Sequence, residues 1–147
     1  MIRDVGAEDV AAIRAVAEAA YAPFVTPIGR RPAPMDADFA AQVAAGQVRV
    51  AGADGFCVSY ANAEGWHVEN LAVRPASQGA GFGIALLEDA ERLAREACAG
   101  AVHLYTNVAM TEALAFYPRR GYVETGRRRE AGFDRAYFRK VLEEGPR

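Results

Sequence analysis

The stretch VRPASQGAGFG, residues 73–83, is the part of the sequence whose residue types and spacing most directly indicate chemistry. Gly79, Gly81 and Gly83 stand at every second position, after an apolar segment and just before the helix-forming run IALLEDAERLAREA. A strand, a glycine-rich turn and a helix start bring several free backbone N–H groups together, and these donors and the helix dipole favour phosphate. Glycine allows close approach and tolerates positive φ. The stretch therefore predicts a phosphate-binding loop.

The spacing of the glycines separates several classes of phosphate ligand. A dinucleotide fingerprint G-x-G-x-x-G fails, because Ile84 or Leu86 occupies the position of its third glycine. A P-loop also fails, because the motif needs G-K-[ST] and the only lysine is Lys140. The pattern Q/R-x-x-G-x-G/A does fit, in the run QGAGFG at residues 78–83. A nucleotide-binding protein is therefore a weaker hypothesis, which competition between ATP and the true ligand would test.

The segment WHVENLAV, residues 66–73, contains two titratable side chains just before this loop. In a regular strand, alternation would place one set of side chains on one face, namely His67, Glu69, Leu71 and Val73. The other face would then carry Trp66, Val68, Asn70 and Ala72. His67 and Glu69 are candidate proton acceptors, since imidazole titrates near neutrality. The alternative is that both are only solvated or hydrogen-bonded near the start of the strand.

The rest of the chain predicts the elements that would position these residues. Apolar periodicity and turn residues indicate strands at 2–5, 47–51, 56–61, 66–73, 101–108, 121–126 and 135–142. They indicate helices within 6–21, 35–46, 81–97 and 111–118, with Glu88–Arg92 and Glu91–Arg95 as solvent-facing pairs. Four prolines make 22–35 a long ordered loop, and 126–134 is expected to be an arginine-rich turn. The order β-α-α-β-β-β-α-β-α-β-β predicts one mixed α/β domain over residues 1–147.

Composition and charge limit the classes of partner and cellular location that we expect. The formal net charge of −2 argues against a nucleic-acid partner or adhesion to an anionic membrane. No apolar run approaches the about 18 residues of a membrane span, and the acidic N-terminus does not suit a signal peptide, so we expect a cytoplasmic protein. Cys57 and Cys98 are isolated and expected to be buried thiols, and no cluster has metal-ligand spacing.

Two segments together resemble the GNAT superfamily of acyl-CoA-dependent N-acyltransferases. LAVRPASQGAGFG, residues 71–83, is similar to the pyrophosphate-binding segment of that family. LYTNVAMTEALAFYPRRGY, residues 104–122, is similar to its later strand–helix segment. The interval between the two and the order of elements also suit the family. The resemblance implies a mostly antiparallel mixed sheet with helices on both faces, acetyl-CoA as co-substrate without a metal, and a homodimer, since many members are dimers.

The resemblance also implies which residues hold acetyl-CoA. Backbone N–H groups of the glycine loop would bind the pyrophosphate, and the strand before it would pair with the pantetheine arm as an added strand does. The backbone within 71–73 would also supply the oxyanion donor. Asn107 would form a hydrogen bond to the pantetheine or to a bound water. The alternative is a purely structural role, in which Asn107 ends its strand or caps the next helix. The implied set is Leu71, Ala72, Val73, Gln78, Gly79, Ala80, Gly81, Phe82, Gly83, Ile84, Asn107 and Phe116.

For catalysis, the resemblance implies Tyr117 as the acid that protonates the CoA sulfur, since a phenol keeps its proton at neutral pH. The alternative is an aromatic packing residue beside Phe116. Glu69 matches the family's base, acting directly or through water, with His67 as the other candidate. His103 is expected to be structural. Three arginines could meet an acidic substrate or be a solvated surface: Arg127, Arg128 and Arg129.

Together these features predict an N-acetyltransferase that moves an acetyl group from acetyl-CoA to a primary amine by direct attack in a ternary complex. A small-molecule acceptor is preferred, because no extended charged groove is visible in the sequence. One alternative is a non-catalytic acyl-CoA-binding or sensor module of the same fold. Another is an acetyltransferase acting on protein N-termini or lysines.

Overall fold

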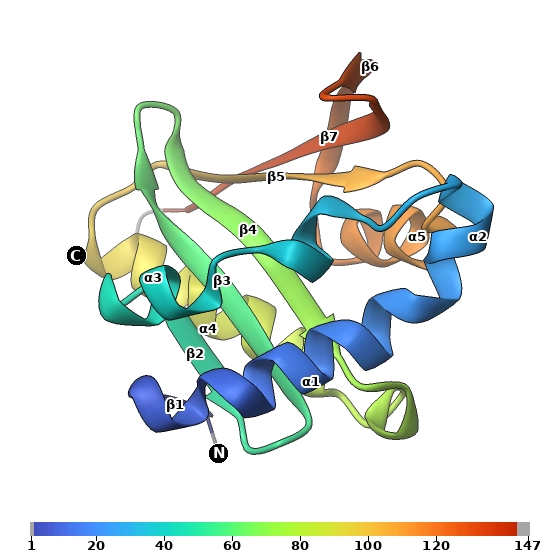
Figure 1. Cartoon of the computed structure of the whole chain (residues 1–147). Helices are drawn as coiled ribbons and strands as arrows, with labels where there is room; N and C mark the ends of the chain where they lie inside the picture. Colours follow the sequence, from blue (N-terminus) through green and yellow to red (C-terminus); the bar gives the residue numbers. More distant parts are fainter. Residues whose placement is uncertain (1, 144–147) are drawn as a thin grey trace.

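The computed structural model describes residues 2–143, which form one seven-stranded sheet (Figure 1). The strand order is β1-β2-β3-β4-β5-β7-β6, and every neighbouring pair is antiparallel except β4 and β5, which are parallel. The bounds are β1 Ile2–Asp4, β2 Val48–Ala51, β3 Gly55–Asn62, β4 Gly65–Val73, β5 Ala101–Asn107, β6 Val123–Glu130 and β7 Phe133–Val141. The prediction of a mixed, mostly antiparallel sheet is confirmed.

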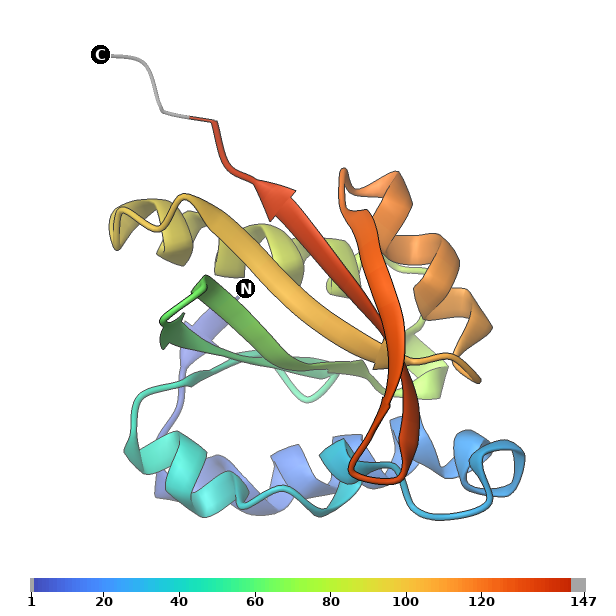
Figure 2. The same cartoon turned by 90° about the horizontal axis from the view of Figure 1, so that it is seen from above.

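Helices cover both faces of the sheet, as Figure 2 shows from above. One face carries α1 Val10–Tyr21, α2 Val25–Ile28 and α3 Phe39–Ala44, with the short 3-10 turns η1 Ala7–Asp9, η2 Ala22–Phe24 and η3 Ala33–Asp36. The other face carries α4 Phe82–Glu96 and α5 Thr111–Arg119, and η4 Pro75–Ser77 lies between β4 and α4. None of the helices between residues 2 and 143 is long and apolar enough to cross a membrane.

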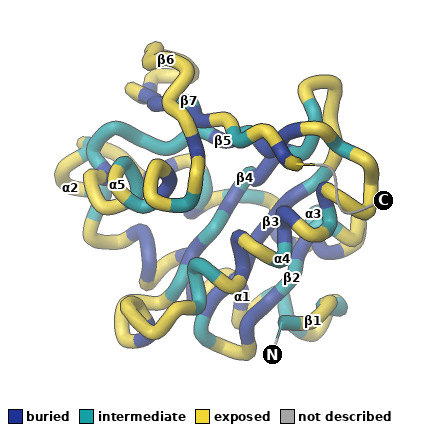
Figure 3. Tube along the Cα trace, turned by 180° about the vertical axis from the view of Figure 1, so that it is seen from behind, coloured by how far each residue is buried: buried dark blue, intermediate teal, exposed yellow. Residues whose placement is uncertain are grey.

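Two apolar cores lie on the two faces of the sheet. The α1 side buries Ile13 and Phe39 against Phe56, whose ring meets that of Phe39 edge to face at 5.6 Å between centroids. The α4 side buries Leu86 and Phe138 with their neighbours. Figure 3 shows the buried segments along the central strands and the exposed β6. The sheet is therefore fixed from both faces except at its β6 edge.

Several local predictions were wrong. Glu91 is buried on α4, where it accepts from Tyr122 at 2.7 Å and pairs with Lys140 at 3.2 Å, so it is no solvent-facing partner of Arg95. Cys57 is buried as expected, but Cys98 is exposed.

The prediction of an arginine-rich turn at residues 126–134 was also wrong. Arg127, Arg128 and Arg129 lie on β6, and the hairpin turn is the dipeptide Ala131–Gly132 between β6 and β7. Each arginine pairs with an acidic side chain of the same hairpin, for example Arg127 with Glu124 at 3.0 Å. The stretch 22–35 is not one helix, as expected, but it folds into η2, α2 and the start of η3 instead of a plain loop.

The sheet opens between β4 and β5. These strands pair only at Trp66 with Val102 and His67 with His103, near their N-terminal ends, and then diverge. Parallel strands β4 and β5 therefore leave a wedge-shaped gap toward their C-terminal ends, visible in Figure 1.

A β-bulge lies where the gap begins. Val58 pairs with Asn70 and Ser59 pairs with Val68, so Glu69 is an extra residue on β4. A bulge leaves its residue unpaired and breaks the alternation of faces. Trp66, Val68, Leu71 and Val73 accordingly all pack with the α4-side core. The prediction that Leu71 and Val73 share a face with His67 was wrong.

Candidate functional site

The glycine loop adopts the backbone that its composition predicts. Gly79 and Gly81 have φ of +86° and +91°, a region that side-chain-bearing residues rarely adopt. A Cβ built on either residue meets no atom within 4 Å, so the surface above the loop is open. Gly81 is the N-cap of α4, and the N–H groups of the first helical residues have no partner inside the helix. The open cradle and free donors fit the pyrophosphate of a CoA thioester.

Side chains before the loop hold it in place. Asp54 accepts from Ser77 at 2.6 Å and from Arg74 at 2.8 Å, which ties the start of the loop to the β2–β3 turn. Gln78 folds back, and its Nε2 donates to the carbonyl of Val73 at 3.0 Å. Hydrogen bonds within the chain thus hold the start of the loop against the β2–β3 turn and the end of β4.

The backbone of β4 presents to the gap groups that do not bond its neighbour β3. The N–H of Arg74 donates to the carbonyl of Asp54 at 2.8 Å, and Ala72 faces Phe56 in the same register. In an antiparallel pair, residues alternate between bonding the neighbour and pointing away from it. Ala72 therefore bonds to β3, whereas Leu71 and Val73 direct their N–H and C=O groups into the gap. There the carbonyl of Leu71 accepts from the Tyr21 hydroxyl at 3.4 Å and the carbonyl of Val73 accepts from Gln78.

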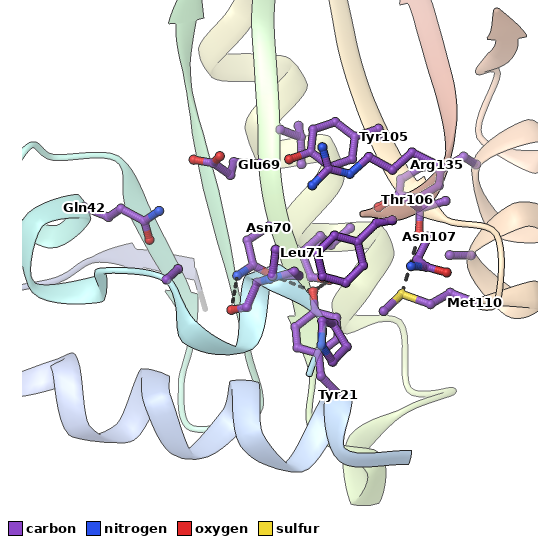
Figure 4. A pocket seen from close by; sticks show the side chains of 18 of the residues that line it. Tyr21, Gln42, Glu69, Asn70, Leu71, Tyr105, Thr106, Asn107, Met110 and Arg135 are labelled. Carbon is purple, nitrogen blue, oxygen red and sulfur yellow. Dashed lines mark hydrogen bonds between the residues drawn. The ribbon is translucent and has the colours of Figure 1, made fainter. Parts of the chain in front are cut away.

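A cavity of about 350 Å³ passes through this gap (Figure 4). It brings together Glu69 and Leu71 from β4, Asn107 from β5 and Tyr117 from α5, all of which line it. The glycine loop lies beyond the end of β4 on the α4 side. His67 is separate: it lines a neighbouring hollow of about 340 Å³ with His103.

Tyr117 is buried but reaches the cavity. Its ring packs against Phe116 at 5.2 Å and against Tyr122 and Phe138, both at 5.7 Å between centroids. Burial raises the pKa of the phenol far above its usual value near 10, so it is protonated at any physiological pH. Tyr117 is thus both a packing residue and a hydrogen-bond donor available to the cavity.

Glu69 is held by its strand and by one neighbour. The bulge directs its side chain to the cavity, where Tyr60 donates to Oε2 at 3.0 Å. Burial and the nearby carboxylate raise the pKa of Tyr60 to about 12, so the phenol remains a donor. Glu69 keeps its other oxygen available for an amine or a water.

His67 and His103 contact each other at the closed end of the gap. Their Nδ1 atoms are 3.2 Å apart, and Nε2 of His103 lies 2.8 Å from Oδ1 of Asn62. Burial lowers the pKa of both imidazoles, and His103 also lowers the pKa of His67. The contact of His103 with His67 and Asn62 supports a structural role for this residue.

Asn107 and Phe116 occupy the C-terminal end of the gap. Oδ1 of Asn107 accepts from the N–H of Ala109 at 2.9 Å, which turns the chain after β5 toward α5. Phe116 lies 3.7 Å from a Cβ built on Gly83, an ordinary van der Waals contact, so the ring of α5 packs beside the start of α4. Asn107 thus forms a strand-end turn and also lines the cavity.

The wall opposite the glycine loop contains residues that the sequence analysis missed. Tyr21 donates to Oδ1 of Asn70 at 2.6 Å, and Nδ2 of Asn70 donates to the carbonyl of Pro34 at 3.2 Å. Arg135 and Phe133 of β7 also line the cavity. The sequence did contain one signal for Asn70, since it is a polar residue directly before the apolar end of the strand at 66–73.

Within residues 2–143, no three His, Cys, Asp or Glu side chains converge on a point where a metal ion could bind. Acyl transfer to an amine can proceed without a metal, because it needs a base, an oxyanion donor and stabilisation of the leaving thiolate. The cavity presents a candidate group for each: Glu69, the β4 backbone and Tyr117.

Comparison with known proteins agrees with this geometry. The family model described as "Acetyltransferase (GNAT) domain" matches residues 39–124, more than half of the chain. No curated protein matches the sequence.

Solved structures match over nearly the whole chain. PaiA N-acetyltransferase from Thermoplasma acidophilum, in complex with coenzyme A, has a TM-score of 0.77 at 16% identity and covers 97% of this chain and 98% of its own. A GCN5-related N-acetyltransferase from Rhodopseudomonas palustris has a TM-score of 0.79 at 22% identity, covering 97% and 95%. The ribosomal-protein-S18-alanine N-acetyltransferase from Escherichia coli has a TM-score of 0.74 at 18% identity, covering 99% and 96%. These likenesses establish the fold.

Proposed function

This chain belongs to the acetyltransferase (GNAT) family, and we propose that it transfers an acetyl group from acetyl-CoA to the amine of a small molecule. The observation that carries the proposal is the cavity through the β4–β5 gap, which Glu69, Tyr117 and the β4 residue Leu71 all line. Its volume of about 350 Å³ falls in the range of small-molecule sites. The family match alone shows that the chain contains a GNAT acetyltransferase domain.

Acetyl-CoA would lie along the open edge of β4. The backbone donors from Gln78 to Ile84 would bind the pyrophosphate, and the N–H and C=O groups of Leu71 and Val73 would pair with the pantetheine amides. The carbonyl of Val73 now accepts from Gln78 at 3.0 Å. Binding would therefore include replacement of that hydrogen bond by one from the pantetheine.

The reaction would start with loss of a proton from the acceptor ammonium to Glu69, directly or through a water. The amine nitrogen then attacks the thioester carbonyl, whose developing oxyanion an N–H within 71–73 would stabilise. Collapse of the tetrahedral intermediate forms the amide and breaks the C–S bond. The sulfur leaves as a thiolate that takes a proton or a hydrogen bond from Tyr117.

Burial changes what Tyr117 can contribute. Its pKa is raised well above that of a thiol, about 8.5 for the free cysteine side chain, so full transfer of the phenolic proton to sulfur is uphill. We expect Tyr117 to act chiefly as a hydrogen-bond donor to the departing sulfur. The thiolate would then be protonated by the proton that the amine released to Glu69.

Direct transfer, without an acyl-enzyme, is supported by the cysteines. Cys57 packs in the α4-side core, and burial raises the pKa of its thiol to about 12, so it is not a nucleophile. Cys98 is exposed just beyond α4. Neither cysteine of residues 2–143 lines the cavity.

Calorimetry and a thiol-release assay test the proposal. We expect the purified protein to bind both CoA and acetyl-CoA, and to release free CoA when an amine from a panel of small molecules and peptides is added. Absence of heat with either form of CoA contradicts the assignment. Binding of acetyl-CoA without turnover of any amine would instead favour the sensor module, and turnover of peptides alone would favour a protein acceptor.

A further inference from the structure

Arg135 is a buried cation in the wall of the cavity. Its side chain, on β7, is only 9% exposed, and its guanidinium lies 4.2 Å from the centroid of the Tyr105 ring. Figure 4 shows the guanidinium beside Tyr105 at the cavity. Stacking on an aromatic face fixes the plane of a guanidinium and leaves its N–H edge free to bind a planar anion. Arg135 is therefore oriented before any ligand arrives.

Most of the hydrogen-bond donors of Arg135 are available to a ligand. Within the described part of the chain, its only side-chain partner is Glu130, through Nη1 and Oε1 at 3.1 Å. A guanidinium has five N–H donors. None of its nitrogen atoms is among the fully buried polar atoms that lack a partner, and the residue lines the cavity, so its remaining donors can be reached by a ligand there.

The charge around Arg135 is incompletely balanced. Glu130 also accepts from Arg128 at 3.2 Å and from the Tyr137 hydroxyl at 2.9 Å. One carboxylate thus faces two guanidiniums, and the group keeps a net positive charge. Arg128 is 64% exposed and screened by water, but Arg135 is not. A buried cation gains most from a counter-charge that a ligand brings with it.

Carboxylates line the same cavity from other elements. Glu69 comes from β4, and Figure 4 shows it across the cavity from Arg135. Asp38, the N-cap of α3, lies at the rim. The cavity therefore offers an anionic side for an ammonium and a cationic group for an anion, within a volume that suits a small molecule.

We propose that the acceptor is a small amino-carboxylate, such as a free amino acid, whose carboxylate binds Arg135 while its amine faces Glu69. This inference rests on the proposed function and specifies its substrate class. Arg127, Arg128 and Arg129 pair with acidic side chains of their own hairpin. The acidic group of the substrate is therefore assigned to Arg135, inside the cavity, and not to these three residues. The planar fork of Arg135 favours a carboxylate bound through two hydrogen bonds.

The test compares each acid with its own amide. The probes are the common L-amino acids, β-alanine and γ-aminobutyrate, each assayed beside its carboxamide with acetyl-CoA and the full chain, by release of CoA thiol. We expect kcat/KM for the best acid to exceed that for its carboxamide by about tenfold or more, the usual weight of a charge-assisted bidentate contact. This comparison needs no variant. The proposal is overturned if kcat/KM for the carboxamides equals that for the acids.

Variants locate the effect. Arg135→Gln should bring the acid-to-amide ratio close to one and raise KM for the acid, with acetyl-CoA affinity by calorimetry unchanged. Arg127→Gln, on the exposed face of the same hairpin, is the matched control and should preserve the ratio. If Arg135→Gln does not fold, Arg135→Lys keeps the charge, loses the fork and should still lower the ratio.

The outcomes distinguish this inference from the proposed function. Intact acetyl-CoA binding with turnover of plain amines or peptides, but of no amino acid in the panel, overturns the carboxylate assignment alone. An acid-to-amide ratio that survives in Arg135→Gln does the same. Loss of acetyl-CoA binding in the unmodified protein overturns the proposed function itself.

Discussion

The two sides of the candidate site, the glycine loop with the end of β4 and the cavity wall opposite it, are built in different ways. The part toward α4 is formed by backbone: the left-handed Gly79 and Gly81 beyond the end of β4, and the groups of Leu71 and Val73 that point away from β3. The opposite side is formed by side chains from distant parts of the chain, such as Pro34 and Arg135. The family model matches residues 39–124 and so includes the first side and omits η3 and β7. The backbone side is the part that a family shares, and the side-chain side is where one member can differ from another.

The largest expected loss of activity follows from a change at Glu69, which lies between the two sides. Glu69→Gln removes the proposed base without changing its size, and general-base catalysis contributes about 10²- to 10⁴-fold. We expect kcat to fall by at least about 10²-fold with little change in the affinity for acetyl-CoA. The control is Glu88→Gln on the exposed side of α4, which should be neutral. Full activity of the Glu69 variant would place the base elsewhere, with His67 the next residue to test.

A second change would break the backbone side alone. Gly81→Val places a β-branched side chain at φ +91°, which shifts the loop and removes donors from the pyrophosphate. We expect acetyl-CoA to bind about 50-fold more weakly by calorimetry, from the loss of one or two charge-assisted hydrogen bonds.

Gly29→Val is the matched control for this change. Gly29 has φ +87°, also has no atom within 4 Å of a built Cβ, and lies after α2, away from the loop. Both variants should lose similar thermal stability, but only Gly81→Val should lose affinity. Equal affinities would mean that the glycines serve only to turn the chain.

The leaving-group side gives a smaller effect. Tyr117→Phe removes one hydroxyl and keeps the ring contacts with Phe116, Tyr122 and Phe138. We expect kcat to fall about tenfold, the weight of one hydrogen bond to a charged atom, with unchanged acetyl-CoA affinity. Because the pKa of Tyr117 is far above neutrality, its ionisation should add no limb to the pH–rate profile below pH 10. Unchanged turnover would leave Tyr117 a packing residue only.

The backbone side could be predicted from the sequence, because its signals are local. Glycine spacing, the strand before it and the helix after it lie within residues 66–97 and depend on chain conformation alone. The face pattern of β4 could not be predicted, because a single bulge at Glu69 exchanges the two faces for Leu71 and Val73. Nothing in WHVENLAV marks the extra residue, since the bulge is defined only by pairing with β3.

The side-chain side could not be predicted, because long-range pairing creates it. Arg135 resembles Arg127, Arg128 and Arg129 in sequence, and only the β5–β7 register places it beside Tyr105 while the others remain on the exposed β6. Glu91 follows the same rule: periodicity suggested solvent, whereas Tyr122 and Lys140 meet it in the interior. Such contacts depend on which strands become neighbours.

The smallest expected effect concerns the closed end of the gap, which belongs to neither side. Burial lowers the pKa of His67 and His103, while Glu64 and Glu69 act to raise it and Arg139 to lower it. An unfolded chain takes up protons at these sites below about pH 6.5, but the folded chain resists doing so. Their contribution to stability is therefore complete above that pH and is lost as the pH falls through the lowered folded-state values.

His67→Gln should therefore make the decline of thermal stability between pH 7.5 and pH 5 shallower than in the unmodified protein. Melting temperatures measured at several pH values in that window test this, with the exposed Glu88→Gln as the reference for a change that leaves the slope alone. A slope that does not change would mean that His67 holds a proton as readily in the folded chain as in the unfolded one. Burial at the closed end would then cost the imidazolium of His67 nothing, and the contrast between a buried imidazole pair and a carboxylate open to the cavity would be lost.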